Sequence, residues 1–94
     1  MSSERRLFKS EERQQRSLVS AFLRQIADKI EAGQVILRQG QQEISLQLPA
    51  NLVLEIQVEE EDKRGKGLQH SLEIEIKWFE GDEAGESAGG LELG

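Results

Sequence analysis

The chain has 94 residues, which is enough for one small domain and too few for a two-domain enzyme. Its 12 lysines and arginines stand against 18 acidic residues, and the resulting formal net charge of −6 excludes a strongly basic nucleic-acid module on overall electrostatics. Because the chain contains no cysteine, disulfides, thiolate metal sites and cysteine nucleophiles are excluded.

The segment before residue 16 allows two interpretations. Ser10 could cap a helix with Glu11 and Glu12 in its first turn. However, residues 11–15 offer no apolar side chain to bury. We therefore expect an extended segment over residues 6–13, with Phe8 facing inward, and a helix that begins near Gln15.

Residues 16–32 have the apolar periodicity of an amphipathic helix. The apolar side chains recur at spacings of three and four and form one helix stripe: Leu18, Val19, Phe22, Leu23, Ile26 and Ile30. Gly33 follows where a left-handed C-terminal cap is favoured, so we expect the helix to end there.

After Gly33 the apolar period changes from 3.6 to 2, which is typical of strands with one buried face. The alternating segments are 34–38, 43–48, 52–59 and 72–78. Turn signals separate them at Gly40, at Pro49 and in a loop expected over residues 60–69. Strict alternation favours antiparallel strands over a parallel sheet covered on both sides.

These elements predict an α+β fold with two layers, in which one amphipathic helix packs on a four- or five-stranded, mainly antiparallel sheet. The expected core joins the helix stripe to the inward side chains of the strands. Trp78 continues the alternation of Leu72, Ile74 and Ile76, so we expect its ring to close one end of that core.

The expected domain organisation is a flexible N-terminus over residues 1–5, a single domain over 6–80 and a disordered Gly-rich, acidic tail over 81–94. No apolar run exceeds three residues, so no membrane span is expected. The N-terminus leads into no signal-peptide core, and the expected location is the cytoplasm.

The run Leu72-Glu73-Ile74-Glu75-Ile76-Lys77-Trp78 resembles the Amphi-Trp domain family, small prokaryotic proteins named for an amphipathic final strand that closes on a tryptophan. The helix with Phe22-Leu23-Arg24-Gln25-Ile26-Ala27 before Gly33, and the strand end Leu46-Gln47-Leu48-Pro49, extend the resemblance over residues 7–80. The resemblance implies the fold, and it implies no activity, ligand or site.

Charge is divided unevenly along the chain. Residues 1–38 carry a net charge of +3 and residues 39–94 a net charge of −9. The basic residues Arg16, Arg24 and Lys29 lie on the predicted helix. If the last two strands pair, an acidic row lies on the solvent-exposed face of the predicted sheet: Glu55, Glu59, Glu73 and Glu75. This acidic row would suit a basic partner or a divalent cation. Alternatively, its charges keep a flat sheet surface solvated, and we favour this second interpretation. Phe79 is expected to point away from the core and to be free for contact.

A catalytic site is not supported by the pattern. His70 is the sole histidine, and the chain has no cysteine, so neither residue type is present to complete a metal site or a catalytic pair with it. We expect His70 to be a solvated loop residue. Gly65-Lys66 is followed by Gly67, where a phosphate-binding loop needs Ser or Thr. We therefore expect no enzyme activity, no metal and no cofactor.

The expected function is that of a small non-catalytic binding or protein-interaction module, with a protein partner or a second copy of the chain as its target. Phe79, Glu55, Glu73, Glu75, Arg16, Arg24 and Lys29 are the candidate contact residues. The alternative is a weak nucleic-acid or anion binder that uses the basic side of the helix. Against this alternative, few aromatic residues are present to stack bases.

Overall fold

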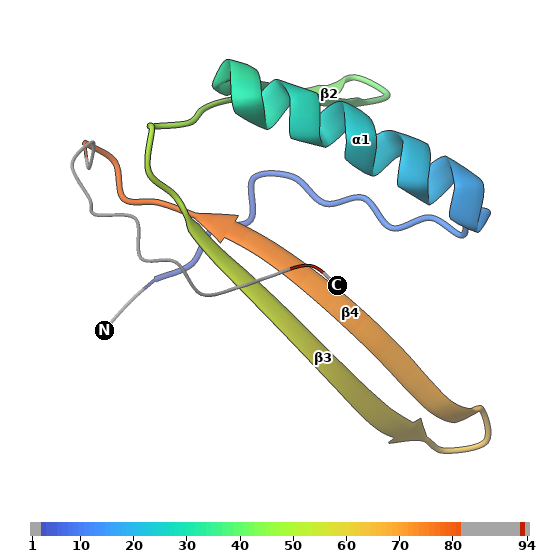
Figure 1. Ribbon diagram of the computed structural model, residues 1–94. Coiled ribbons are helices and arrows are strands. Elements are labelled where there is room, and N and C mark those ends of the chain that lie inside the picture. The colour runs from blue at the N-terminus through green and yellow to red at the C-terminus, as the bar shows by residue number, and fades with distance from the viewer. Residues whose placement is uncertain (1–2, 82–92, 94) are drawn as a thin grey trace. The chain divides into compact units, whose positions relative to one another are not determined.

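One helix and four strands make up the regular structure of residues 3–81 and 93, the part of the chain that the computed structural model describes (Figure 1). The chain divides into two units, Met1–Leu48 and Pro49–Gly94. The α+β class is thereby confirmed. The segment predicted as an acidic tail lies outside the described residues apart from Gly81 and Leu93.

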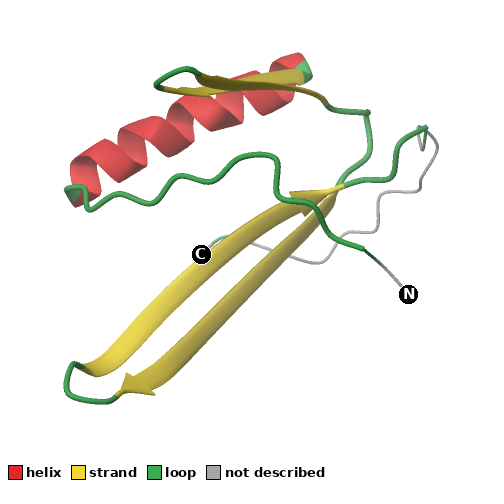
Figure 2. Ribbon diagram, turned by 180° about the vertical axis from the view of Figure 1, so that it is seen from behind, coloured by secondary structure: helices red, strands yellow, loops and turns green. Residues whose placement is uncertain are grey.

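In the first unit, helix α1 spans Arg16–Ala32 and is followed at once by strands β1, Gln34–Gln39, and β2, Gln42–Gln47 (Figure 2). The amides of Leu18 and Val19 donate to the carbonyl of Gln15 at 3.0 and 3.1 Å. The helix therefore begins one residue after the predicted position. The extended backbone expected over residues 6–13 belongs to no strand, and Phe8 is half-buried.

The helix ends on Gly33, which adopts the left-handed conformation with φ of 88°. Its N–H donates to the carbonyl of Ile30 at 3.0 Å, so the chain reverses direction directly into β1. This is the C-terminal cap that the sequence predicted. The sharp reversal places β1 against α1, where Val35 is 6% exposed.

β1 and β2 form an antiparallel hairpin with Val35 opposite Leu46 and Leu37 opposite Ile44. Gly40, with φ of 60°, makes the tight turn between them. Two side-chain interactions tie the unit together at its surface. Arg38 pairs with Glu43 at 3.0 Å across the hairpin, and Gln39 Nε2 donates to Glu12 Oε1 at 3.1 Å from the segment before the helix.

In the second unit, strands β3, Val53–Lys63, and β4, Gly67–Lys77, form a longer antiparallel hairpin. The loop predicted over residues 60–69 is wrong in its extent, because the strands continue to Lys63 and resume at Gly67. Residues 59–62 are all acidic, so the apolar alternation stops there while the backbone ladder continues. The end of the apolar alternation therefore does not mark the end of the strand.

The prediction of one four- or five-stranded sheet is wrong. The described strands form two separate two-stranded sheets, β1–β2 and β3–β4. The end of β2 offers a physical reason: the amide of Leu48 donates to the carbonyl of Gly33 at 2.9 Å, and Pro49 has no N–H to extend a ladder. At the start of the connection between the hairpins, the amide of Leu48 is therefore already bonded, and Pro49 has no amide hydrogen to donate to another strand.

Few of the apolar side chains assigned to the predicted core are buried within the units that the structure describes. Val35 is the hydrophobic side chain that is buried among them, and Trp78 lies just beyond β4 and is half-buried. Phe79, by contrast, is 80% exposed, as expected from its position. Most of the apolar surface that the sequence pattern assigns to an interior is exposed.

The cap at Gly33 provides a stability test. A Cβ added there would lie 3.9 Å from the carbonyl oxygen of Leu48, so space is sufficient and the cost is backbone strain. We expect Gly33→Ala to lower the free energy of unfolding by about 1–2 kcal/mol, because an L-residue is disfavoured in the left-handed region. Gly33→Asn should cost less, since asparagine tolerates that region. Urea unfolding followed by circular dichroism measures both variants, and equal losses would contradict this explanation.

Candidate functional site

The register of the β3–β4 hairpin sorts its side chains onto two chemically different faces. Leu54 pairs with Ile76, Ile56 with Ile74 and Val58 with Leu72. Successive side chains of a strand point to opposite sides, so all six lie on the same side of the hairpin. We call this set the hairpin apolar face: Leu54, Ile56, Val58, Leu72, Ile74 and Ile76.

The hairpin apolar face is open. Val58 is 74% exposed, Leu72 67% and Leu54 52%, and Ile76 at one end of the face is half-buried. Single exposed apolar residues are ordinary on protein surfaces, but a contiguous set at paired positions marks a surface made for contact. A two-stranded hairpin is also marginally stable by itself in water. This face is therefore the strongest candidate for an interaction site.

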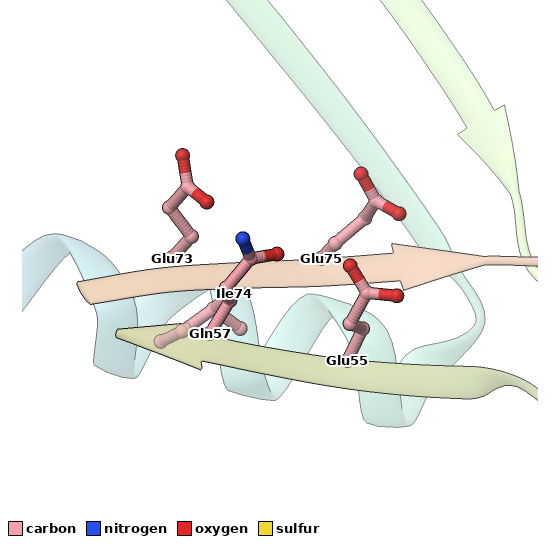
Figure 3. Close-up of a pocket in the computed structure, with 5 residues that line it drawn as sticks. All are labelled: Glu55, Gln57, Glu73, Ile74 and Glu75. Atoms are coloured by element: carbon pink, nitrogen blue, oxygen red, sulfur yellow. The ribbon is translucent and has the colours of Figure 1, made fainter. Parts of the chain in front are cut away.

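The opposite side of the hairpin is acidic, as predicted. Glu55 and Glu75 are direct partners in the register, and Glu73 is opposite Gln57. Figure 3 shows the carboxylates of Glu55, Glu73 and Glu75 standing on the same side of the two strands, around a shallow hollow of about 370 Å³. We call Glu55, Glu59, Glu73 and Glu75 the acidic face.

Lys77 relieves the repulsion within the acidic face. Its Nζ lies 3.2 Å from Glu55 Oε1 and 3.4 Å from Glu75 Oε1, so one ammonium bridges the two opposed carboxylates. The hydrogen bond from Lys77 to Glu55, and then the negative charges of Glu55 and Glu75, raise the pKa of Lys77 above its usual value. Spacing along the chain does not reveal which carboxylates a long side chain reaches, so this bridge was not predicted.

The described residues contain no group of three or more histidine, aspartate or glutamate side chains arranged to hold a metal ion. His70 lies on β4 and not in the loop predicted for it, with its Nδ1 3.7 Å from Glu60 Oε2 across the hairpin. Both side chains are exposed. The pair is consequently a solvent-exposed contact on the surface of the hairpin.

A second exposed apolar surface lies on α1. Leu18 is 55% exposed, Phe22 53% and Leu23 47%, whereas Ile26 and Ile30 are half-buried towards the end of the helix that meets β1. The helix stripe is thus covered at its C-terminal end and open at its N-terminal end. The segment before the helix approaches that open part, where Ser10, Glu12 and Gln14 share a hollow with Leu18 and Phe22, among others.

The candidate basic residues do not form one patch on α1. Arg16 and Arg24 line the same hollow together with Ser20 and Ala27. At 3.6 residues per turn, Lys29 lies about 140° around the helix from both arginines. The structure therefore brings Arg16 and Arg24 to one side and leaves Lys29 on another.

A family model described as the Amphi-Trp domain matches the chain over residues 1–94. No curated protein and no solved structure matches it. Within the described residues, no helix has both the length and the apolar character needed to cross a membrane.

The bridge at Lys77 predicts a specific pH dependence. A lysine whose pKa is raised in the folded state stabilises that state fully below its unfolded pKa of about 10.4, and the stabilisation is lost as pH rises through the folded pKa. We expect the Lys77 side chain to titrate above the ordinary lysine range when its ¹³Cε shift is followed by NMR. The double variant Glu55→Gln with Glu75→Gln should return the midpoint to that range. An unchanged midpoint in the double variant would show that the carboxylates do not hold the charge.

Proposed function

The chain belongs to the Amphi-Trp domain family, and from this premise we propose that it is a non-catalytic protein-interaction module whose contact surface is the hairpin apolar face. The observation that carries the proposal is the exposure of Val58, Leu72 and Leu54 at adjacent, register-paired positions. Burying these side chains against a partner would remove apolar surface from water, which is the dominant favourable term in most protein association.

Several features of the described hairpin support binding over catalysis. Enzyme sites place a small number of polar groups inside an enclosed, largely apolar cleft. Here most of the polar side chains lie on the side of the two strands opposite the hairpin apolar face. The polar groups that do approach one another, such as Lys77 with Glu55 and His70 with Glu60, are exposed ion pairs.

The acidic face contributes selectivity to this proposal. The exposed carboxylates on the opposite side of the hairpin favour a partner that carries positive charge, and they repel acidic surfaces during the encounter. They also oppose edge-to-edge association of hairpins, because like charges would face one another across the new strand pair. Phe79, which is exposed beyond the end of β4, is a separate apolar contact candidate.

The alternative function is weak binding of nucleic acid or another anion through the basic side of α1. Arg16 and Arg24 support it because they line one hollow. Asp28 and Glu31 follow Arg24 by four and seven residues and thus lie near it on the helix surface. We rank this alternative lower, since the third candidate, Lys29, lies elsewhere on the helix and acids accompany the arginines.

Site-specific photocrosslinking tests the proposed function. A benzophenone side chain placed at Val58 projects from the hairpin apolar face, whereas one at the neighbouring Gln57 projects from the opposite side. In a native-cell extract we expect the Val58 probe to capture protein and the Gln57 probe to capture little. Equal capture at the two positions, or none at either, would contradict the assignment of the contact surface.

A further inference from the structure

We propose that α1 and the segment before it form a binding site for a small apolar amine, that is, a compact hydrocarbon group that carries an ammonium. The site is the hollow between residues 10–14 and the first half of α1, which we call the helix hollow. The residues that line it all belong to the unit Met1–Leu48, so it shares no residue with the hairpin apolar face. The inference therefore goes beyond the proposed function and does not depend on it.

The floor of the helix hollow is apolar and is provided by α1. Leu18 and Phe22 are four residues apart, so they are neighbours on the helix surface. Val19 and Leu23 form a second such pair beside them. These four side chains are between 46% and 55% exposed. A hydrocarbon group seated on them would remove apolar surface from water, which is favourable.

The wall of the helix hollow is the irregular segment that runs beside α1 (Figure 2). Its side chains alternate as on an extended backbone, because Ser10, Glu12 and Gln14 line the hollow whereas Glu11 and Arg13 do not. Glu12 is therefore the charged residue among the described side chains that line the hollow. The site combines an apolar floor with a single negative charge on its wall.

Glu12 is held in place by neutral donors. Gln39 Nε2 donates to Glu12 Oε1 at 3.1 Å, and Gln14 Nε2 donates to Glu12 Oε2 at 2.8 Å. Lys9 pairs with Glu11 at 3.9 Å, and none of the described basic side chains forms an ion pair with Glu12. A carboxylate has about four acceptor positions, so about two of them stay open. The charge of Glu12 is thus both fixed in position and available to a ligand cation.

This combination selects the chemistry of the ligand. An ammonium has N–H donors for the open positions of Glu12, and charge-assisted hydrogen bonds are stronger than neutral ones. The hydrocarbon part would lie on Leu18 and Phe22, and a flat ring would also stack against the Phe22 ring. The hollow has a volume of about 380 Å³, within the roughly 300–1,000 Å³ typical of small-molecule sites. A carboxylic acid of the same size would be repelled by Glu12.

An NMR titration of the full ¹⁵N-labelled chain with phenethylammonium chloride tests the proposal. We expect saturable amide shifts centred on Glu12, Leu18 and Phe22, with a dissociation constant of roughly 1 mM, as suits a ligand of this size. The neutral control is 2-phenylethanol, which carries a hydroxyl in place of the ammonium and should bind roughly tenfold more weakly. Equal affinities for the two probes would overturn the proposal, because the charge would then play no part.

A matched pair of variants locates the ammonium. Glu12→Gln removes the charge from the wall but keeps the size of the side chain. It should weaken phenethylammonium binding roughly tenfold and leave the affinity for 2-phenylethanol unchanged, which also shows that the hollow is intact. Glu11→Gln removes the same charge one residue away, outside the lining of the hollow, and should leave both affinities unchanged. Equal losses in the two variants, or no loss in Glu12→Gln, would overturn the assignment of the ammonium to Glu12.

The floor is tested by Phe22→Ala, which truncates the ring. We expect the affinities for both probes to fall by a similar factor of roughly ten, because apolar contact is lost with either ligand. Circular dichroism of the variant checks that the helix content is kept, and unchanged binding would contradict the proposed floor.

The acidic face of the hairpin also attracts cations, so the location of the shifts matters. Shifts confined to β3 and β4 would place the amine on the acidic face and overturn the proposal, as would the absence of saturable shifts. Neither result would bear on the proposed function, which concerns the hairpin apolar face.

Discussion

The antiparallel pairing of β3 with β4 is the constraint on which the rest of the second unit depends. Because Ile56 lies opposite Ile74, the apolar residues of both strands other than Val53 project from one side, and the strand carboxylates other than Glu60 and Asp62 project from the other. A shift of the register by one residue would move one strand's apolar set to the acidic side, so the pairing is strongly specified. The open apolar surface, the acidic surface and the bridge at Lys77 all follow from this single alignment.

The two faces of the hairpin have complementary physical roles. In the proposed interaction, the hairpin apolar face would supply the free energy of association, since burial of exposed aliphatic side chains is favourable and non-directional. The acidic face contributes little affinity but influences which surfaces can approach, because exposed charges act on encounter and orientation. Lys77 allows Glu55 and Glu75 to stand opposite each other, a position where two carboxylates alone would repel.

Local chemistry made the individual elements predictable. The helix end at Gly33 needs one glycine after an amphipathic run, and the structure has the left-handed cap at that residue. That Glu55 and Glu75 share a face follows from alternation once the two strands pair, whereas the register that sets them opposite each other was not predicted. The extension of β3 to Lys63 was not predictable in this way, because Glu59, Glu60 and the two acids after them carry no apolar alternation. The half-burial of Trp78 likewise depends on what packs around it and not on its phase along the strand.

The sequence by itself determined which side chains share a face: residues two apart in a strand, and three or four apart in a helix, point the same way whatever surrounds them. Only the tertiary structure decided that β1–β2 and β3–β4 form separate sheets, and that Leu54, Val58 and Phe22 are exposed. The physical reason is that periodicity fixes the direction of a side chain, whereas burial requires a second surface brought close by non-local packing. The net charge of −6 is likewise the sum of +2 on one unit and −8 on the other. How the charge is divided between the units depends on the boundary after Leu48, which the folded chain sets.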